Sequence, residues 1–253
     1  MGLCSTEAIV VGGHNLGEAD RIIVFYTRNR GKVRAVAAGA RRIRSRFGGS
    51  FEIFTHGRLV YFERPLTTLH KVNEFAVLES FRELREDLTW LGQGAYLIEL
   101  ASAAVPDEEP NEDLYSLLSH SLHLLTQVPS PDLLLRAFEI HLLRILGYLP
   151  ELHHCLLCKA PTPPAAGLGL SPHHGGLICP SCQPQARDSL PLSPPSLAFL
   201  LSVLRSDICL TLKIPEDSSI KGELNSCLGS CIAYFLGRTI RSKDFLTQLS
   251  VPL

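Results

Sequence analysis

The sequence predicts a multidomain α+β protein that combines an N-terminal five-stranded OB-type β-barrel, a mainly α-helical body and a small cysteine-bracketed insert. Three observations predict this class. Strand-sized segments separated by turns occupy residues 6–79. Apolar residues then recur at a spacing of three to four, which is typical of helices. Two Cys-x-x-Cys pairs enclose a stretch rich in proline and glycine.

The domain boundaries follow from these patterns. The barrel, the first part of the helical domain, the insert and the second part of the helical domain are expected at 1–79, 80–150, 151–185 and 186–253. Turn sequences such as RNRG and RPLT separate the strands, which are expected at 6–13, 20–27, 32–40, 50–63 and 69–79. The apolar-periodic segments predict helices at 88–105, 112–128, 130–149, 193–205 and 223–240, the last continuing to 249. Ser130 with Pro131 is a typical helix start, because serine caps the helix and proline fits its first turn.

The two cysteine pairs have the spacing of a structural zinc site, because each Cys-x-x-Cys turn directs two sulfurs at one ion. The predicted ligands are Cys155, Cys158, Cys179 and Cys182. Four protein ligands leave no open position for catalysis, so the metal is expected to be structural. The segment between the pairs has too little apolar surface to fold alone. We therefore predict a small Cys4 zinc-finger insert that needs Zn to hold its fold.

Other interpretations of the cysteines stay open. The pairs could form disulfides or hold a different metal, and a neighbouring histidine could replace one ligand: His153, His154, His173 or His174. A redox Cys-x-x-Cys usually sits singly at a helix start in a βαβ context, which is absent here. Cys227 and Cys231 could form a second site with Cys209, but buried thiols that act as small hydrophobes are the simpler interpretation.

The charge of the chain is unevenly distributed. Residues 1–71 hold twelve Lys and Arg against five Asp and Glu, although the whole chain has a net charge of −1. Planar guanidinium groups pair bidentately with phosphates, and loops between OB-barrel strands bind oligonucleotides. The loop ARRIRSRFGG and the strand before it therefore predict a nucleic-acid-binding surface made of Lys32, Arg34, Arg41, Arg42, Arg44 and Arg46.

Seven aromatic residues lie in or beside the predicted strands: Phe25, Tyr26, Phe47, Phe51, Phe54, Tyr61 and Phe62. Exposed aromatic rings could stack on bases. Barrels need an apolar core, however, so most of these rings should point inward and only one or two should be exposed.

Composition and motifs exclude several function classes. No apolar run approaches the roughly 20 residues that cross a bilayer, and no secretory signal is evident at the N-terminus. The scattered cysteines outside the two pairs favour a reducing cytoplasm. P-loop, HExxH and GxSxG motifs are absent from the sequence, so we expect a binding protein rather than an enzyme.

Three segments carry a resemblance to a known family. They are GEADRIIVFYTRNRGKVRAVAAGARRIRS in the barrel, LLRILGYLPELHHCLLC at the first cysteine pair and YFLGRTIRSKDFL near the C-terminus. In this order, along nearly the whole chain, the sequence resembles the RecO family of bacterial DNA repair and recombination proteins. The segment FGGSFEIFT after the basic loop departs from the family pattern.

The resemblance implies a non-catalytic recombination mediator that binds single- and double-stranded DNA and anneals complementary strands. Its implied partners are RecR and the single-stranded-DNA-binding protein, and it would help to load RecA onto coated strands. It would act in the bacterial cytoplasm at the nucleoid and contact no membrane. Gly39 to Arg42 with Ser45 and Arg46 match the family's DNA-binding loop, and the four cysteines match its zinc ligands. Basic positions that would contact DNA or a partner's acidic tail correspond to Arg238, Arg241 and Lys243.

Two hypotheses of other classes remain. A zinc-dependent nucleic-acid-processing enzyme would need an open metal position or an acidic cluster, and cleavage of labelled DNA would reveal it. A protein-interaction scaffold would use the basic loop to bind acidic peptide tails, and its binding to coated DNA would depend on such a tail.

Overall fold

A computed structural model describes the chain except for residues 1, 65, 164–166, 214–216 and 250–253. The described residues form two compact units, one within 2–123 and the other within 124–248. Within the described residues, no helix is both long enough and apolar enough to span a bilayer.

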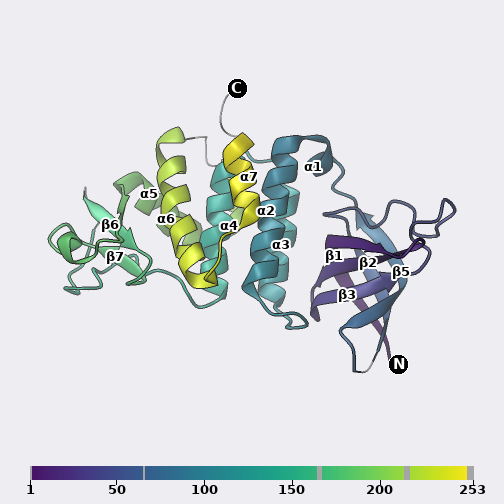
Figure 1. Cartoon of the computed structure of the whole chain (residues 1–253). Helices are drawn as coiled ribbons and strands as arrows, with labels where there is room; N and C mark the ends of the chain where they lie inside the picture. The colour runs from purple at the N-terminus through teal and green to yellow at the C-terminus, as the bar shows by residue number, and fades with distance from the viewer. Residues whose placement is uncertain (1, 65, 164–166, 214–216, 250–253) are drawn as a thin grey trace. The chain divides into compact units, whose positions relative to one another are not determined.

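Five strands close into a barrel in the first unit (Figure 1). They are β1 (Gly2–Leu16), β2 (Asp20–Thr27), β3 (Gly31–Ala37), β4 (His56–Glu63) and β5 (Leu69–Glu79). The paired order is β1-β2-β3-β5-β4, with β4 returning to β1. The β3–β5 pair is parallel and the other four pairs are antiparallel. This five-stranded arrangement confirms the predicted OB-type barrel.

Residues 38–55, which we call the basic loop, connect β3 to β4 through consecutive turns. The backbone N–H of Ser45, for example, donates to the carbonyl of Arg42 at 2.9 Å. Phe54 has a φ of 76°, in the left-handed region that strands do not use. The strand expected at 50–63 therefore begins only at His56, and the prediction was wrong for residues 50–55.

The interior of the barrel is filled by buried side chains from all five strands and from the basic loop. Phe47 and Phe51 enter it from the loop and are 5% and 3% exposed. Their ring centroids lie 4.8 Å apart, and Phe51 also lies 6.1 Å from Phe25 of β2. Burying a phenylalanine stabilises a fold by about 1.5–3 kcal/mol, so these two side chains fix the base of the loop.

Three helices complete the first unit; the second and third begin at the predicted residues 88 and 112, and the first, a single short turn, was not predicted. They are α1 (Glu83–Glu86), α2 (Leu88–Ala104) and α3 (Glu112–Leu124). The carboxylate of Asp87 accepts the backbone N–H groups of Thr89 and Trp90 at 2.8 and 3.0 Å and so caps α2. Asn111 accepts the N–H of Leu114 at 2.9 Å at the start of α3.

The second unit is built around α4 (Pro131–Ile145), whose residues 133–143 are all buried. This helix packs against α5 (Pro194–Leu204), α6 (Ser218–Leu236) and the 3-10 segment η2 (Ile208–Lys213). The predicted cap at the start of α4 is not formed by a side chain, because Ser130 makes no capping hydrogen bond. Pro131 occupies the first turn, as predicted.

The last two helices are separate, although the sequence predicts a continuous one. α6 ends at Gly237, which has a φ of 62° and donates its N–H to the carbonyl of Ala233 at 3.0 Å. A left-handed glycine is a common helix terminator because it has no Cβ to clash. α7 (Arg241–Leu249) begins as a separate helix after residues 237–240.

A small antiparallel sheet, which the sequence pattern did not predict, joins the insert to the residues that follow its predicted end at 185. Its strands β6 (Leu168–Ser171), β7 (Gly176–Ile178) and β8 (Leu190–Leu192) pair in the order β7-β6-β8, and the short 3-10 segment η1 (Gln183–Gln185) precedes β8. Strands of three or four residues are too short to produce a clear alternation of apolar and polar residues.

Candidate nucleic-acid interface and four-cysteine centre

The basic loop projects four exposed arginine side chains: Arg41, Arg42, Arg44 and Arg46. None of them forms an ion pair with a described residue. The guanidinium of Arg46 lies 4.7 Å from the ring centroid of Phe47, which is an attractive cation–π distance. The loop is therefore a concentrated positive surface whose charge is not neutralised within the described part of the fold.

The basic loop is fixed to the turn between β1 and β2. Arg41 donates its backbone N–H to Ala19 O at 2.9 Å and its Nη1 to Gly17 O at 2.7 Å. The N–H of Gly39 donates to the Asp20 carboxylate at 2.8 Å. OB barrels commonly use this β1–β2 turn for oligonucleotides, so the four arginines lie beside a region suited to a nucleic-acid strand.

Lys32 and Arg34, the two strand cations of the predicted DNA surface, both contact Asp107 in the segment after α2. Lys32 Nζ and Arg34 Nη2 each lie 2.9 Å from an oxygen of this carboxylate, and Nζ also donates to Ser102 O at 2.6 Å. The Lys32 side chain is 13% exposed, whereas that of Arg34 is 54% exposed. Arg34 is therefore accessible to a phosphate, while Lys32 holds the acidic segment against β3.

Replacing Asp107 by asparagine is expected to strengthen DNA binding, because it frees the guanidinium of Arg34. We expect a complex about two- to five-fold tighter at low salt and a salt slope steeper by about 0.7–0.9 for each released cation. Fluorescence anisotropy titrations of labelled oligonucleotides at several salt concentrations measure both quantities.

Glu86→Gln is the matched control for this variant, because Glu86 is paired with Arg82 outside the barrel. It removes the same unit of negative charge without freeing a barrel cation. An equal gain in affinity for both variants would mean that net charge alone is responsible, and the role given to Asp107 would be wrong.

The barrel aromatics serve mainly as core. Six of the seven are buried: Phe25, Tyr26, Phe47, Phe51, Phe54 and Tyr61. Phe62 is partly exposed. The expectation that most rings point inward is therefore correct, and Phe47 and Phe51 pack rather than present a face for stacking.

The three C-terminal basic residues are placed differently from one another. Arg238 and Arg241 are exposed. Lys243 instead points toward α6, where its Nζ donates to Asn225 O at 3.2 Å and burial lowers its pKa. A side chain at Gly229 would occupy the position of this ammonium group. A shared contact surface made of all three residues stays a prediction.

The four cysteines of the two pairs converge in the insert. Their sulfur atoms lie within 4.8 Å of one another, and the Sγ atoms of Cys158 and Cys179 are 3.7 Å apart. Cys155 is fully buried and its sulfur accepts the N–H of Cys179 at 3.4 Å. This donor set can hold one metal ion with four thiolate ligands.

Backbone donors prepare this centre for a metal. Burial alone would raise the pKa of Cys155, but the N–H groups of Cys158, Cys179 and Leu157 lower it to about 6. These backbone donors favour the thiolate form of Cys155, which is the form that ligates a metal. Lys159 has a φ of 60°, the left-handed conformation that ends the first cysteine turn and that glycine would adopt without strain.

The four neighbouring histidines have other partners than the cysteine cluster. His174 Nδ1 lies 2.8 Å from Ser171 Oγ, and that hydroxyl donates to Asp188 at 2.6 Å. His173 Nδ1 lies 3.3 Å from the hydroxyl of Tyr234 on α6. The backbone N–H groups of His153 and His154 both donate to the carboxylate of Glu151. These contacts fold the insert and connect it to α6.

Cys227 and Cys231 are buried thiols, as the simpler interpretation expects, and burial raises the pKa of each to about 12. Cys209 is exposed. In the described part of the chain, the four insert cysteines are the group that is positioned to bind a metal.

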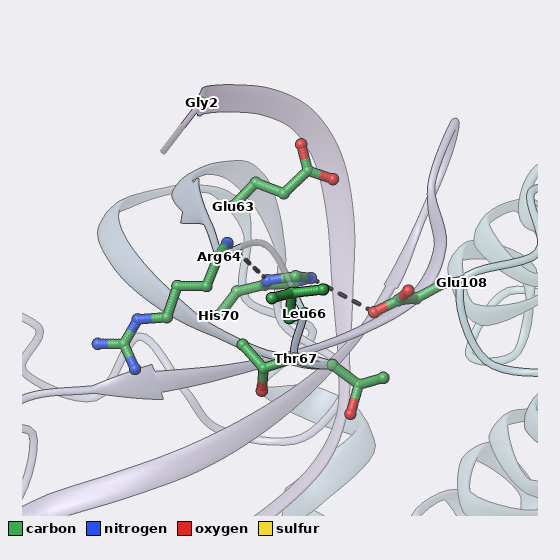
Figure 2. A pocket seen from close by; sticks show the side chains of 8 residues that line it. Gly2, Glu63, Arg64, Leu66, Thr67, His70 and Glu108 are labelled. Carbon is green, nitrogen blue, oxygen red and sulfur yellow. Dashed lines mark hydrogen bonds and ion pairs between the residues drawn. The ribbon is translucent and has the colours of Figure 1, made fainter.

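A pocket of about 780 Å³ is lined by Glu63, at the end of β4, and by residues of the loop that follows (Figure 2). The basic loop precedes the other end of β4, at His56. Inside it, His70 Nδ1 accepts the N–H of Arg64 at 3.3 Å, and its Nε2 lies 3.4 Å from Glu108 (Figure 2). Both ring nitrogens are thus occupied, and the mixed charges of the lining do not favour a polyanion.

The most strongly perturbed histidine is inaccessible. His141 of α4 is 2% exposed, and burial lowers its pKa to about 4. A neutral imidazole inside a helical core cannot meet a substrate, so this pKa shift reflects packing and does not mark a catalytic group.

A closed OB barrel with an arginine-rich loop, joined in one chain to a helical unit with a four-cysteine cluster, defines a multidomain OB-fold protein. The family model described as Recombination protein O N terminal matches residues 1–81, and Recombination protein O C terminal matches residues 85–244. The chain belongs to the RecO family of DNA repair proteins.

Curated relatives agree over nearly the full length. The DNA repair protein RecO of Symbiobacterium thermophilum is 37% identical over 98% of this chain and 98% of its own. The relative of the same name from Roseiflexus is 35% identical over 96% of this chain and 85% of its own. The DNA repair protein RecO of Anaeromyxobacter dehalogenans is 33% identical over 95% of this chain and 94% of its own.

Proposed function

We propose that this protein is a non-catalytic recombination mediator. It binds single- and double-stranded DNA, anneals complementary strands and, with RecR, helps to load RecA onto single strands coated by the single-stranded-DNA-binding protein. Membership of a family of DNA repair proteins supports this role. The observation that carries the proposal is the basic loop, whose four exposed arginines form no ion pair with a described residue.

The mechanism is electrostatic and follows from the loop geometry. Guanidinium groups that contact phosphates release condensed counterions, and this release drives binding independently of sequence. Strands held through their phosphates keep their base edges free to pair. Exposed Arg238 and Arg241 are proposed to contact DNA or the acidic tail of a partner. The setting is the bacterial cytoplasm at the nucleoid.

Zinc is the proposed metal of the cysteine centre, in a structural role. A tetrahedron with Zn–S bonds of about 2.3 Å has sulfur–sulfur edges of about 3.8 Å. The observed separation of 3.7 Å between Cys158 and Cys179 fits such an edge. Four thiolates complete the coordination, so the ion would stabilise the insert and take no part in a reaction.

Strand annealing tests the proposed function. The protein is expected to accelerate pairing of two complementary labelled oligonucleotides several-fold over the spontaneous rate, both bare and coated by the single-stranded-DNA-binding protein. The yield should be the same with and without Mg²⁺, and the strands should stay intact on a denaturing gel. Cleavage of the strands would favour the processing-enzyme hypothesis, and binding to coated strands only through the partner's acidic tail would favour the scaffold hypothesis.

A further inference from the structure

One large aliphatic side chain lies fully in solvent at the centre of the basic loop. Ile43 has a relative exposure of 105% and is flanked in sequence by Arg42 and Arg44, both exposed. Within residues 38–55, all of which the structure describes, every other apolar side chain larger than alanine is buried or partly buried. A single exposed aliphatic side chain needs no explanation by itself. Ile43 differs in its place between exposed arginines that form no ion pair with a described residue, so a ligand held by those arginines would also meet Ile43.

The position of Ile43 is held by contacts on both sides. Before it, Arg41 is tied to the carbonyls of Gly17 and Ala19 at 2.7 and 2.9 Å. After it, Ser45 donates its N–H to Arg42 O at 2.9 Å, and the Phe47 ring is buried in the barrel. The side chain therefore projects from an anchored turn, which limits the conformational entropy lost when it meets a ligand.

Charge and shape together select the ligand. The arginines on either side attract a repeating anion, and an aliphatic group between them needs an apolar face at the same place. A DNA strand offers both, because charged phosphates alternate along it with the flat faces of bases. Apolar side chains such as isoleucine are known to enter base steps and unstack them. An acidic peptide has the charge but no comparable array of apolar faces.

We propose that Ile43 inserts between neighbouring bases of a bound DNA strand while the flanking arginines hold its phosphates. This inference rests on the proposed function and adds the residue that opens the base stack. An opened stack exposes the base edges, which is the state a strand needs in order to pair with its complement. Phe47 and Phe51 of the basic loop are buried, so this insertion takes the place of aromatic stacking in the loop.

The test uses single-stranded oligonucleotides that carry 2-aminopurine, whose fluorescence rises when it is unstacked. Wild-type protein is expected to raise the fluorescence about two-fold or more on binding. Ile43→Ser should remove most of this rise and weaken binding by about three- to ten-fold, as expected for the loss of one apolar contact. The salt slope should stay the same, because phosphate contacts are unchanged.

Two further variants complete the test. Ile43→Leu should keep the fluorescence rise, because it keeps an aliphatic group of the same volume. Leu66→Ser is the matched control: Leu66 is 106% exposed on another loop of the same barrel, beside Glu63 and Glu108, and its loss should change nothing.

The outcomes separate the inference from the proposed function. Equal fluorescence rises for wild type and Ile43→Ser, or DNA binding by wild type with no rise at all, would overturn the insertion and leave DNA binding by the loop intact. A wild-type protein that does not bind the oligonucleotide at low salt would overturn both.

Discussion

The variant in which Arg41, Arg42, Arg44 and Arg46 are all alanine is expected to lose most of its DNA affinity. Each phosphate neutralised on a single strand contributes about 0.7 to the slope of log affinity against log salt. Four such contacts contribute close to three logarithmic units at about 0.1 M salt, so we expect binding to weaken by about 100-fold or more. The slope should become shallower by two to three, which anisotropy titrations across a salt series would measure, and all DNA sequences should be affected alike.

The matched control replaces the same four arginines by lysine. Lysine keeps the charge but not the planar, bidentate geometry. This variant should keep the salt slope and lose only about three- to ten-fold in affinity. Because the side chains are exposed and Phe47 and Phe51 anchor the loop, both variants should melt at nearly the wild-type temperature. An alanine variant that binds with unchanged affinity and slope would remove the loop from the DNA interface.

Sequence reasoning succeeded where the signal is local. The bounds of β2 and β5 agree with the predicted ranges 20–27 and 69–79, because turn sequences lie next to them. The convergence of the four cysteines was predictable for the same reason, since each pair is a short turn whose geometry is set by its own residues. The family assignment is confirmed by matches that cover almost the entire chain.

Contacts between residues that are far apart in the chain could not be predicted from the sequence. Nothing in the strand that holds Lys32 and Arg34 indicates that Asp107, more than 70 residues later, neutralises part of its charge. Lys243 looked equivalent to Arg241 in the sequence, yet the missing side chain of Gly229 leaves room for it to point toward α6. Such outcomes depend on tertiary packing, which a pattern of charges along the chain does not contain.

The start of β4 was mispredicted for a related reason. Phe51 and Phe54 lie in a segment that resembles a strand by its composition. In the structure these rings are buried by a looping backbone, and Phe54 adopts a positive φ to reach its position. The apolar residues were correctly expected to be buried, but burial alone does not distinguish a strand from an anchored loop.

Loss of the metal is expected to have the largest effect on stability. Cys155→Ser removes a fully buried thiol of the cluster. If the proposed zinc is bound, wild-type protein should contain about one zinc per chain and the variant almost none, as measured by mass spectrometry of the metal content. The insert has little apolar core of its own, and the buried cluster around the cysteines is small. Zinc binding contributes roughly 10 kcal/mol or more to the folding of small zinc modules. Without the metal, the amides of the insert should therefore lose their protection against hydrogen exchange.

Hydrogen exchange separates this effect from global unfolding. Amides in β6, β7 and the two cysteine turns are expected to exchange at least 100-fold faster in Cys155→Ser, whereas barrel amides in β1–β5 should keep their protection. Cys209→Ser is the matched control, because Cys209 is an exposed thiol in the same unit and outside the cluster. It should retain the metal and the wild-type exchange pattern.

The same variant distinguishes a structural ion from a functional one. If zinc only holds the insert together, Cys155→Ser should keep the DNA affinity and the salt slope of the barrel loop, because the loop arginines lie in the other compact unit. Metal-free protein with an intact exchange pattern that nevertheless fails to anneal strands would contradict the structural role. In that case the cysteine centre would have to contact DNA or a partner directly. The proposal that the barrel binds DNA while the metal only stabilises the insert would then be wrong.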